Sequence, residues 1–172
     1  GLADGIDDKS DFRTVCNAMQ AVGIETEERT CFFRVVAAVL LLGEVAFESD
    51  TGRSGEEVAT LAAPRRGDPS SSSVPTIAML LSIDPDELVA ALLTRTSLAG
   101  TEQLVMQLGP QAAIEARDAL AKSLYANLFR LLVARVNANN GGTEPSTRSI
   151  GVLDIFGFES FASNSLEQLL IN

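Results

Sequence analysis

Histidine is absent from the 172 residues of this chain. Without an imidazole group, the chain cannot build a Ser-His-Asp or Cys-His nucleophilic site. It also cannot bind a metal ion through histidine, which is the commonest nitrogen ligand of zinc. These exclusions remove most classes of hydrolase.

Cysteine is scarce, and basic residues are outnumbered by acidic ones. Cys16 and Cys31 both fall in apolar helical patterns, so we expect two buried, reduced thiols and no disulfide. The chain has 13 Lys and Arg against 23 Asp and Glu, a net charge of -10 and a pI near 4.4. Binders of nucleic acids or anionic membranes carry a basic face, so this balance argues against both.

Long apolar runs are missing as well. The longest, over residues 35–43, is less than half of what a transmembrane helix needs. The start of the chain does not resemble a signal peptide. We therefore expect a soluble, cytoplasmic protein without a transmembrane segment. Hydrophobic residues still make up 46% of the chain, enough for one domain with a sizeable core.

The first quarter of the chain has the apolar spacing of helices. One helix is predicted over residues 9–22, with Asp7 or Asp8 as its N-cap. A second is predicted over residues 26–43, with Thr26 as its N-cap. The later half of the second helix is apolar on almost all sides, which predicts burial within a larger assembly.

Polar and turn-forming residues dominate the next part of the chain. Residues 49–73 indicate a surface loop or a mobile insertion, and the serines at 70–73 leave open a phosphorylated regulatory segment. A further helix is predicted to begin at Pro85 with Asp84 as its cap. Residues 95–108 indicate a protruding loop or a small hairpin.

The second half of the chain predicts two more helices and one strand. The longest helix should begin at Pro110 and end near Asn139. The continuous apolar run at 150–153 is typical of a strand buried on both faces. Asn164 is predicted to cap a last helix that continues to Asn172, where we expect an artificial end of the chain within the helix.

Two residues that could contact a bound ligand follow the apolar run of the predicted strand. In parallel sheets, ligands bind beyond the carboxyl ends of strands, where Asp154 could reach a nucleotide-bound Mg²⁺. Gly157 has no side chain to keep a γ-phosphate away from its N–H group. An ordinary strand end can carry the same Asp-x-x-Gly pattern, so the pattern alone leaves both interpretations open.

The flanking residues resemble a known family. Residues 154–172, DIFGFESFASNSLEQLLIN, resemble the switch II loop and the start of the relay helix of myosin motor heads, whose pattern is DIxGFE-x-F-x-x-NSFEQL-x-IN. Kinesins carry DLAGSE at the corresponding place, so Phe158 and residues 164–172 favour myosin. Residues 117–137, RDALAKSLYANLFRLLVARVN, are similar to the long helix of the myosin upper 50-kDa subdomain. The segments DDKSDFRTVCNAMQAVGI and FRVVAAVLLLGEVAF resemble the region upstream of that helix.

The resemblance implies a role for three residues. Asp154 would hold Mg²⁺ through a water molecule, and Gly157 would donate its backbone N–H to the γ-phosphate of ATP. Glu159 would pair with an arginine of switch I and close the pocket behind the attacking water. Neither the phosphate loop GESGAGKT nor the switch I motif NxNSSRFGK occurs in this sequence, so we expect no ATP hydrolysis by the chain alone.

A regulatory position of the family also has a counterpart. Myosins have a Ser, Thr, Glu or Asp in the actin-contacting loop, sixteen residues before the Asp of DALAK. Counting back from Asp118 gives Glu102, whose charge would replace that of a phosphate group. The alternative is a solvated loop acid without a regulatory role.

Four departures from the family pattern are visible. LHLGN becomes LLLGE at residues 40–44, Leu166 replaces the aromatic of NSFEQ, and the insertion near 64–73 has no counterpart. Phe156 stands where muscle-type myosins have Ala, which favours an unconventional class.

The sequence thus predicts a mainly α-helical subdomain with one buried central-sheet strand, as part of a P-loop NTPase motor domain of the kinesin and myosin kind. Residues 1–148 would belong to the upper 50-kDa helical subdomain, 149–159 to the central-sheet strand and switch II, and 160–172 to the relay helix.

The function implied by the resemblance is an actin-based, ATP-driven motor of the cytoplasmic actin cytoskeleton. ATP, Mg²⁺ and actin filaments would be the partners of the intact protein, and light chains those of regions outside this chain. The alternative is a myosin-like protein without ATPase activity that serves as a passive actin-binding or scaffolding module.

Overall fold

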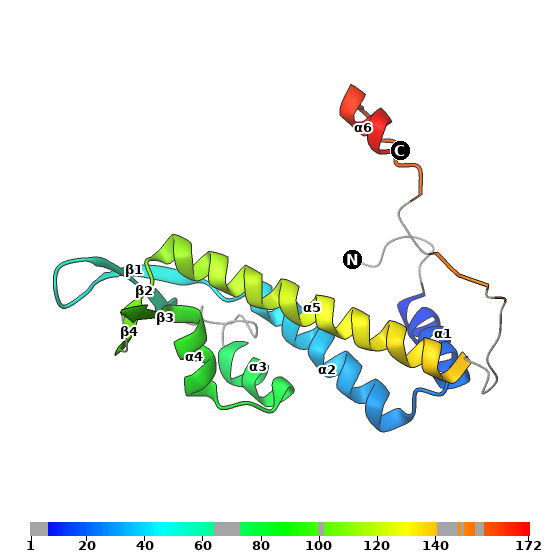
Figure 1. The fold of residues 1–172 in the computed structure, drawn as a ribbon, viewed down its shortest axis with the longest axis horizontal. Helices are drawn as coiled ribbons and strands as arrows, with labels where there is room; N and C mark the ends of the chain where they lie inside the picture. Colours follow the sequence, from blue (N-terminus) through cyan, green and yellow to red (C-terminus); the bar gives the residue numbers. More distant parts are fainter. Residues whose placement is uncertain (1–6, 64–72, 100–101, 141–147, 149, 154–156) are drawn as a thin grey trace. The chain divides into compact units, whose positions relative to one another are not determined.

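The chain divides into two compact units (Figure 1). The computed structural model describes residues 7–63, 73–99, 102–140, 148, 150–153 and 157–172. The first unit, residues 1–140, contains α1 (Asp8–Ala21), α2 (Thr26–Gly43), β1 (Phe47–Thr51), β2 (Glu57–Leu61), α3 (Ser73–Leu81), α4 (Pro85–Leu93), β3 (Thr94–Ala99), β4 (Glu102–Gln107) and α5 (Pro110–Asn140). The second unit, residues 141–172, contains α6 (Leu166–Ile171).

A side-chain cap marks the start of α1 but not that of α2. The Asp7 carboxylate accepts a hydrogen bond from the Ser10 N–H at 3.1 Å, which confirms Asp7 as the cap of α1. At α2 the prediction is wrong by one residue. Thr26 is already helical, and Glu25 is the N-cap without a side-chain cap bond. The Thr26 hydroxyl accepts a hydrogen bond from Arg29 instead.

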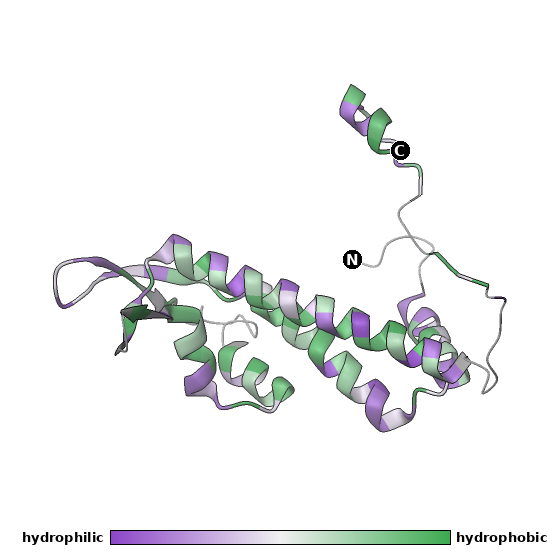
Figure 2. Ribbon diagram, viewed as in Figure 1, coloured by the Kyte–Doolittle hydropathy of each residue, from purple (hydrophilic) through white to green (hydrophobic). Residues whose placement is uncertain are grey.

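The core of the first unit lies where α2, α3 and α4 meet. In Figure 2, α3 and the later turns of α2 are hydrophobic almost throughout. The buried cluster consists of Ala38, Leu42, Val45, Val74, Ile77, Ala78, Leu88 and Leu92. The long helix α5 runs beside α2 and adds partly buried side chains to this cluster (Figure 1).

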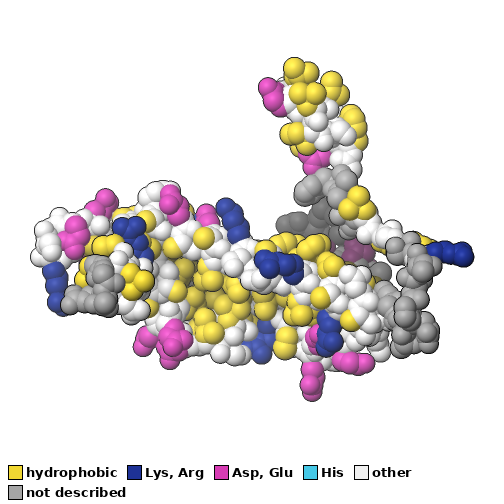
Figure 3. All heavy atoms as spheres, in the orientation of Figure 1, with side chains coloured by type: hydrophobic (Ala, Val, Ile, Leu, Met, Phe, Trp, Pro, Cys, Tyr) yellow, Lys and Arg dark blue, Asp and Glu magenta, His cyan; other side chains and the backbone are white. Residues whose placement is uncertain are grey.

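Burial of α2 is less complete than its composition predicts. Leu40 is 72% exposed and Val36 is 44% exposed, so one side of α2 has no cover within the described residues. Figure 3 shows apolar side chains gathered on the surface over α2 and α5. The two cysteines are free, as predicted, but Cys16 is half-buried and Cys31 is exposed. The expectation of buried thiols is therefore wrong, because neither cysteine is buried in the core.

Two antiparallel hairpins complete the first unit. β3 pairs with β4 from Thr94 opposite Gln107 to Ala99 opposite Glu102, which confirms a hairpin in the segment 95–108. β1 pairs with β2 over residues 47–61, within and just before the segment for which only a surface loop or insertion was expected. Residues 64–72 lie outside the described residues.

The buried strand predicted after the polar loop is not formed in the second unit. Residues 150–153 are neither helix nor strand. Ile150 is 98% exposed, Val152 95% and Leu153 79%. A strand is stabilised by hydrogen bonds to a neighbouring strand, and none of the described residues provides that neighbour. The prediction was correct about apolar character and wrong about burial.

Candidate functional site

The structure describes part of the predicted nucleotide-sensing loop. Asp154 lies outside the described residues, whereas Gly157 and Glu159 lie inside them, in the second unit. For Glu102 the structure describes the backbone, at the first position of β4 in the first unit. The predicted site residues therefore belong to two separate units of the chain.

Gly157 is exposed and has open space around it. A Cβ atom built at this position would meet no atom within 4 Å among those outside its immediate neighbours. The fold of the described residues thus does not require glycine here for steric reasons. A requirement for glycine would instead come from a ligand that approaches the backbone closely.

Both backbone groups of Glu159, the N–H and the carbonyl, form hydrogen bonds with one side chain. The Glu159 N–H donates to Oδ1 of Asn172 at 2.7 Å, and the Nδ2 group of Asn172 donates to the Glu159 carbonyl at 2.7 Å. Glu159 itself is half-buried. The sequence analysis did not detect this contact, because no local pattern marks a bond between residues thirteen positions apart.

The start of α6 has a similar arrangement at shorter range. The Phe161 N–H donates to Oδ1 of Asn164 at 2.9 Å, and Nδ2 of Asn164 donates to the Phe161 carbonyl at 2.6 Å. Because the Asn164 amide is used in this turn, the N-cap of α6 is Ser165, whose hydroxyl accepts from the Gln168 N–H. The prediction of Asn164 as the cap is therefore wrong by one residue. Hydrogen bonding by Ser165 lowers the pKa of the Glu167 carboxyl.

The hairpin that carries Glu102 leads directly into the longest helix. Glu102 pairs with Ala99 at the end of the β3–β4 ladder, and Pro110 begins α5 three residues after β4 ends. Three large apolar residues of this hairpin are exposed: Leu98 at 73%, Val105 at 68% and Leu104 at 48%. The geometry presents apolar side chains and an acidic position on the same protruding element.

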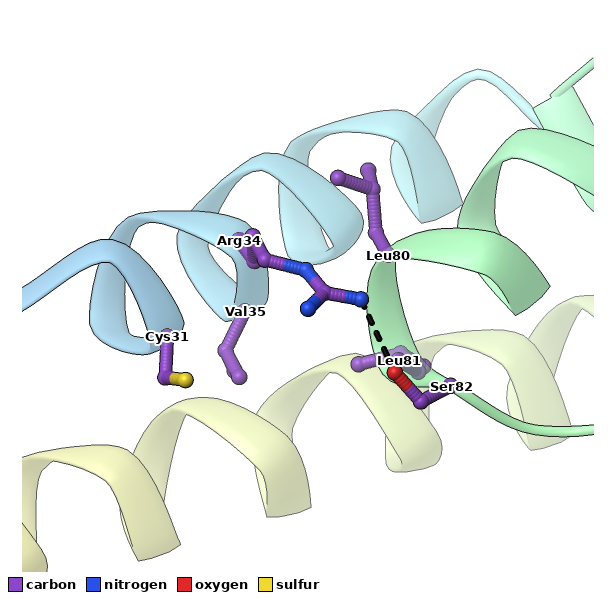
Figure 4. A pocket seen from close by; sticks show the side chains of 6 residues that line it. All are labelled: Cys31, Arg34, Val35, Leu80, Leu81 and Ser82. Atoms are coloured by element: carbon purple, nitrogen blue, oxygen red, sulfur yellow. Dashed lines mark hydrogen bonds between the residues drawn. The ribbon is translucent and has the colours of Figure 1, made fainter. Parts of the chain in front are cut away.

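A small pocket lies between α2 and the end of α3 (Figure 4). Its volume is about 160 Å³, and its lining consists of Cys31, Arg34, Val35, Leu80, Leu81 and Ser82. The Arg34 guanidinium donates to the Met79 carbonyl at 2.7 Å and to the Ser82 hydroxyl at 2.9 Å. Since Ser82 has a left-handed φ of 57°, these bonds hold the turn that ends α3. The pocket is smaller than typical ligand sites, and its cation is already bonded, so we assign it a structural role.

The described part of the chain offers neither a cluster of metal ligands nor a helix that could span a membrane. Within it, no group of three or more Cys, Asp or Glu side chains could hold a metal ion. None of the described helices combines the length and apolar character required to cross a membrane.

Comparison with known proteins decides the family. The family model described as Myosin head (motor domain) matches residues 2–172. This chain belongs to the myosin head family. The resemblance drawn from switch II and the long helix is thereby confirmed.

Individual relatives from fungi, plants and animals agree with this assignment. The chain is 39% identical over 170 residues to Myosin-1 of Pyricularia oryzae and 41% identical over 169 residues to Myosin-6 of Arabidopsis thaliana. It is 39% identical over 171 residues to Unconventional myosin heavy chain 6 of Caenorhabditis elegans. These matches cover 98%, 98% and 99% of this chain but 13%, 11% and 8% of the respective relatives. The chain thus corresponds to a small part of each relative.

Proposed function

We propose that this chain is part of an actin-based, ATP-driven cytoskeletal motor of an unconventional myosin class. The observation that carries the proposal is the family match over residues 2–172, which includes DIFGFE at 154–159 and NSLEQLLIN at 164–172. Phe156 and the similarity to Unconventional myosin heavy chain 6 support the class. The chain would contribute switch II and part of the upper 50-kDa subdomain to a P-loop NTPase motor domain.

Residues of the loop 154–159 would bind and sense the nucleotide. Asp154 would hold Mg²⁺ through a water molecule, and the Gly157 N–H would donate to the γ-phosphate of ATP. The open space at the Cβ position of Gly157 is compatible with this role, because no described atom makes glycine necessary there for packing. Glu159 would pair with an arginine of switch I, which this sequence does not contain.

The β3–β4 hairpin would be the actin-contacting element. Its exposed Leu98 and Val105 offer apolar contact area, and Glu102 would supply a permanent negative charge. Actin filaments, ATP and Mg²⁺ would then be the partners of the intact protein, in the cytoplasmic actin cytoskeleton. Light chains would bind elsewhere in the protein.

The decisive test is a Glu159→Ala substitution in the motor head that contains this chain. We expect ATP binding to stay nearly intact and the hydrolysis step to slow by about two or more orders of magnitude, because the lost ion pair acts at pocket closure and not at capture. Stopped-flow binding of a fluorescent ATP analogue measures capture, and rapid chemical quench measures hydrolysis.

Glu48→Ala is the matched control, since it removes an exposed carboxylate from β1 of the first unit. It should change neither step. A parental motor head that binds actin filaments but never hydrolyses ATP would favour the passive scaffold. Hydrolysis at the parental rate by Glu159→Ala would reject the switch II assignment.

A further inference from the structure

The side chain of Asn172 bonds to the backbone of Glu159 as a facing strand residue would. In an antiparallel pair, one residue exchanges both its N–H and its C=O with the residue opposite. Here the Asn172 carboxamide takes the place of that residue, with its Oδ1 accepting at 2.7 Å and its Nδ2 donating at 2.7 Å. We call these two bonds the Asn172–Glu159 bridge.

The bridge restrains the backbone from which the Glu159 side chain projects. Its two bonds hold the peptide groups on both sides of the Glu159 Cα, so they restrain φ and ψ of that residue together. The Cα–Cβ bond follows from these two angles. Among the described residues, no side chain bonds to the Glu159 carboxylate itself, so the backbone bonds to Asn172 are the described restraint nearest to it.

Asn172 is well placed to act as an anchor. It directly follows α6, and its own N–H donates to the Gln168 carbonyl at 3.2 Å, the spacing of a helical turn. The bridge therefore connects the loop that carries Glu159 to a residue held by α6 instead of to another loop residue. No other described side chain bonds to the backbone of Glu159.

We propose that Asn172 is a positioning residue for Glu159, which aims the carboxylate at its cationic partner when the nucleotide pocket closes. This inference rests on the function proposed above, because it assigns Asn172 an effect on hydrolysis that acts through Glu159. Asn172 itself does not touch the nucleotide.

Asn172→Leu in the intact motor head removes both bonds at nearly constant volume. ATP capture should stay within about twofold of the parent, while the hydrolysis rate constant falls about 10- to 100-fold, the effect of misdirecting a reacting group by about 1 Å. Asn172→Asp keeps the hydrogen-bond acceptor and loses the donor, so its hydrolysis rate constant should lie between those of the parent and Asn172→Leu. This variant replaces Asn172→Leu in the test if the leucine variant does not fold. The measurements are stopped-flow ATP binding and rapid chemical quench.

Asn164→Leu is the matched control. It removes the same two-point bond from Phe161, in the same loop, and leaves the backbone of Glu159 bonded. Its hydrolysis rate should stay within about threefold of the parent, the scale of a local stability change without misplacement. Equal slowing by Asn164→Leu and Asn172→Leu would overturn the proposal in favour of a general structural role.

A double-mutant cycle tests whether Asn172 acts through Glu159. When Glu159→Ala has already removed the carboxylate, Asn172→Leu should produce no further slowing of hydrolysis. A multiplied effect in the double variant would contradict the proposal. If Glu159→Ala hydrolysed ATP at the parental rate, the switch II assignment would be refuted. If Glu159→Ala were slow but Asn172→Leu hydrolysed ATP at the parental rate, the positioning role alone would be refuted.

Discussion

At the scale of single residues, Gly157 separates the requirements of folding from those of ligand binding. Because an added Cβ would meet nothing within 4 Å among the described residues, Gly157→Ala should leave the fold of this part of the motor head unchanged. A methyl group beside the N–H would nevertheless obstruct the γ-phosphate, so hydrolysis should fall further than in Glu159→Ala. Thermal unfolding and single-turnover hydrolysis measure the two effects independently.

Gly151→Ala is the control for this substitution. Gly151 lies in the same unit and is likewise free of atoms within 4 Å of an added Cβ, but it is outside the proposed nucleotide loop. Its hydrolysis should match that of the parent. Equal loss of activity in both alanine variants would show that chain stiffness, and not access to a phosphate, is the reason for glycine.

Glu102 distinguishes regulation from ordinary surface chemistry. Glu102→Ala in the motor head should lower actin-activated ATPase and leave basal ATPase unchanged, because the charge would act at the actin interface. Glu102→Asp should be nearly silent, and Glu102→Ser should respond to phosphorylation. Steady-state ATPase against actin concentration is the measurement, with Glu48→Ala as the control. Superimposable curves for the parent and Glu102→Ala would leave Glu102 a solvated loop acid.

At the scale of elements, the cap of α4 makes a sharp stability prediction. The Asp84 carboxylate accepts hydrogen bonds from the Asp86 N–H at 2.7 Å and the Glu87 N–H at 3.4 Å. Asp84→Ala should cost about 1 kcal/mol, seen as about fivefold faster amide hydrogen exchange over residues 85–93 of the motor head.

Asp86→Ala is the appropriate control for the cap. Asp86 also lies in the first turn of α4, where it interacts with the helix dipole, but its side chain does not cap the helix. Its effect on exchange should stay below about 0.5 kcal/mol. Equal effects of the two substitutions would mean that charge, not the cap bond, stabilises this end of α4.

Helices with strong end signals were predictable from the sequence. Asp84 with Pro85 marks the start of α4, and the helix predicted from Pro110 to about Asn139 is observed as α5. The errors at Thr26 and Asn164 are shifts of one residue. Both residues find other partners close by, a choice that depends on local geometry and not on residue type.

Strands were less predictable because their stability depends on distant parts of the chain. β1 and β2 contain several acidic and small residues with low strand propensity. Contacts with the rest of the unit support them, among them the bond from the Ala59 N–H to the Leu108 carbonyl at 2.7 Å. Gly55, with a φ of 87° in the turn between the two strands, was the available sequence signal for a hairpin. Residues 150–153 show the reverse case, in which strand-like composition has no partner strand among the described residues.

At the scale of the whole molecule, exposed apolar surface is the main feature. In the second unit, Ile150, Val152 and Leu153 are at least 79% exposed, and Ile171 is 78% exposed. Patches of this kind on a separate chain promote association. The predicted site residues could be located from the sequence by resemblance, whereas the cover for these apolar side chains could not be found among the described residues.

The 172-residue chain should therefore associate in solution when produced alone. Replacing Ile150 and Val152 by Lys should increase the monomer fraction, since both side chains are almost fully exposed and make no core contacts. Sedimentation velocity measures this fraction. Replacing Asp50 by Asn and Glu56 by Gln in the first hairpin changes the net charge by the same amount and is a control for charge alone. A monomeric parent chain, or equal rescue by both pairs, would contradict the prediction.

The uninterrupted length of α5 restricts which insertions and deletions its sequence can accept. Its 31 residues contain no Pro or Gly after Pro110, so the helix spans about 46 Å without a residue that favours a kink. Its first end follows the β3–β4 hairpin, and near its other end Asn139 donates to the Val22 carbonyl after α1. One inserted residue would rotate everything beyond it by about 100° and move it by about 1.5 Å, which would break one set of contacts. Insertions or deletions within α5 are therefore compatible with the fold only in near-whole numbers of helical turns.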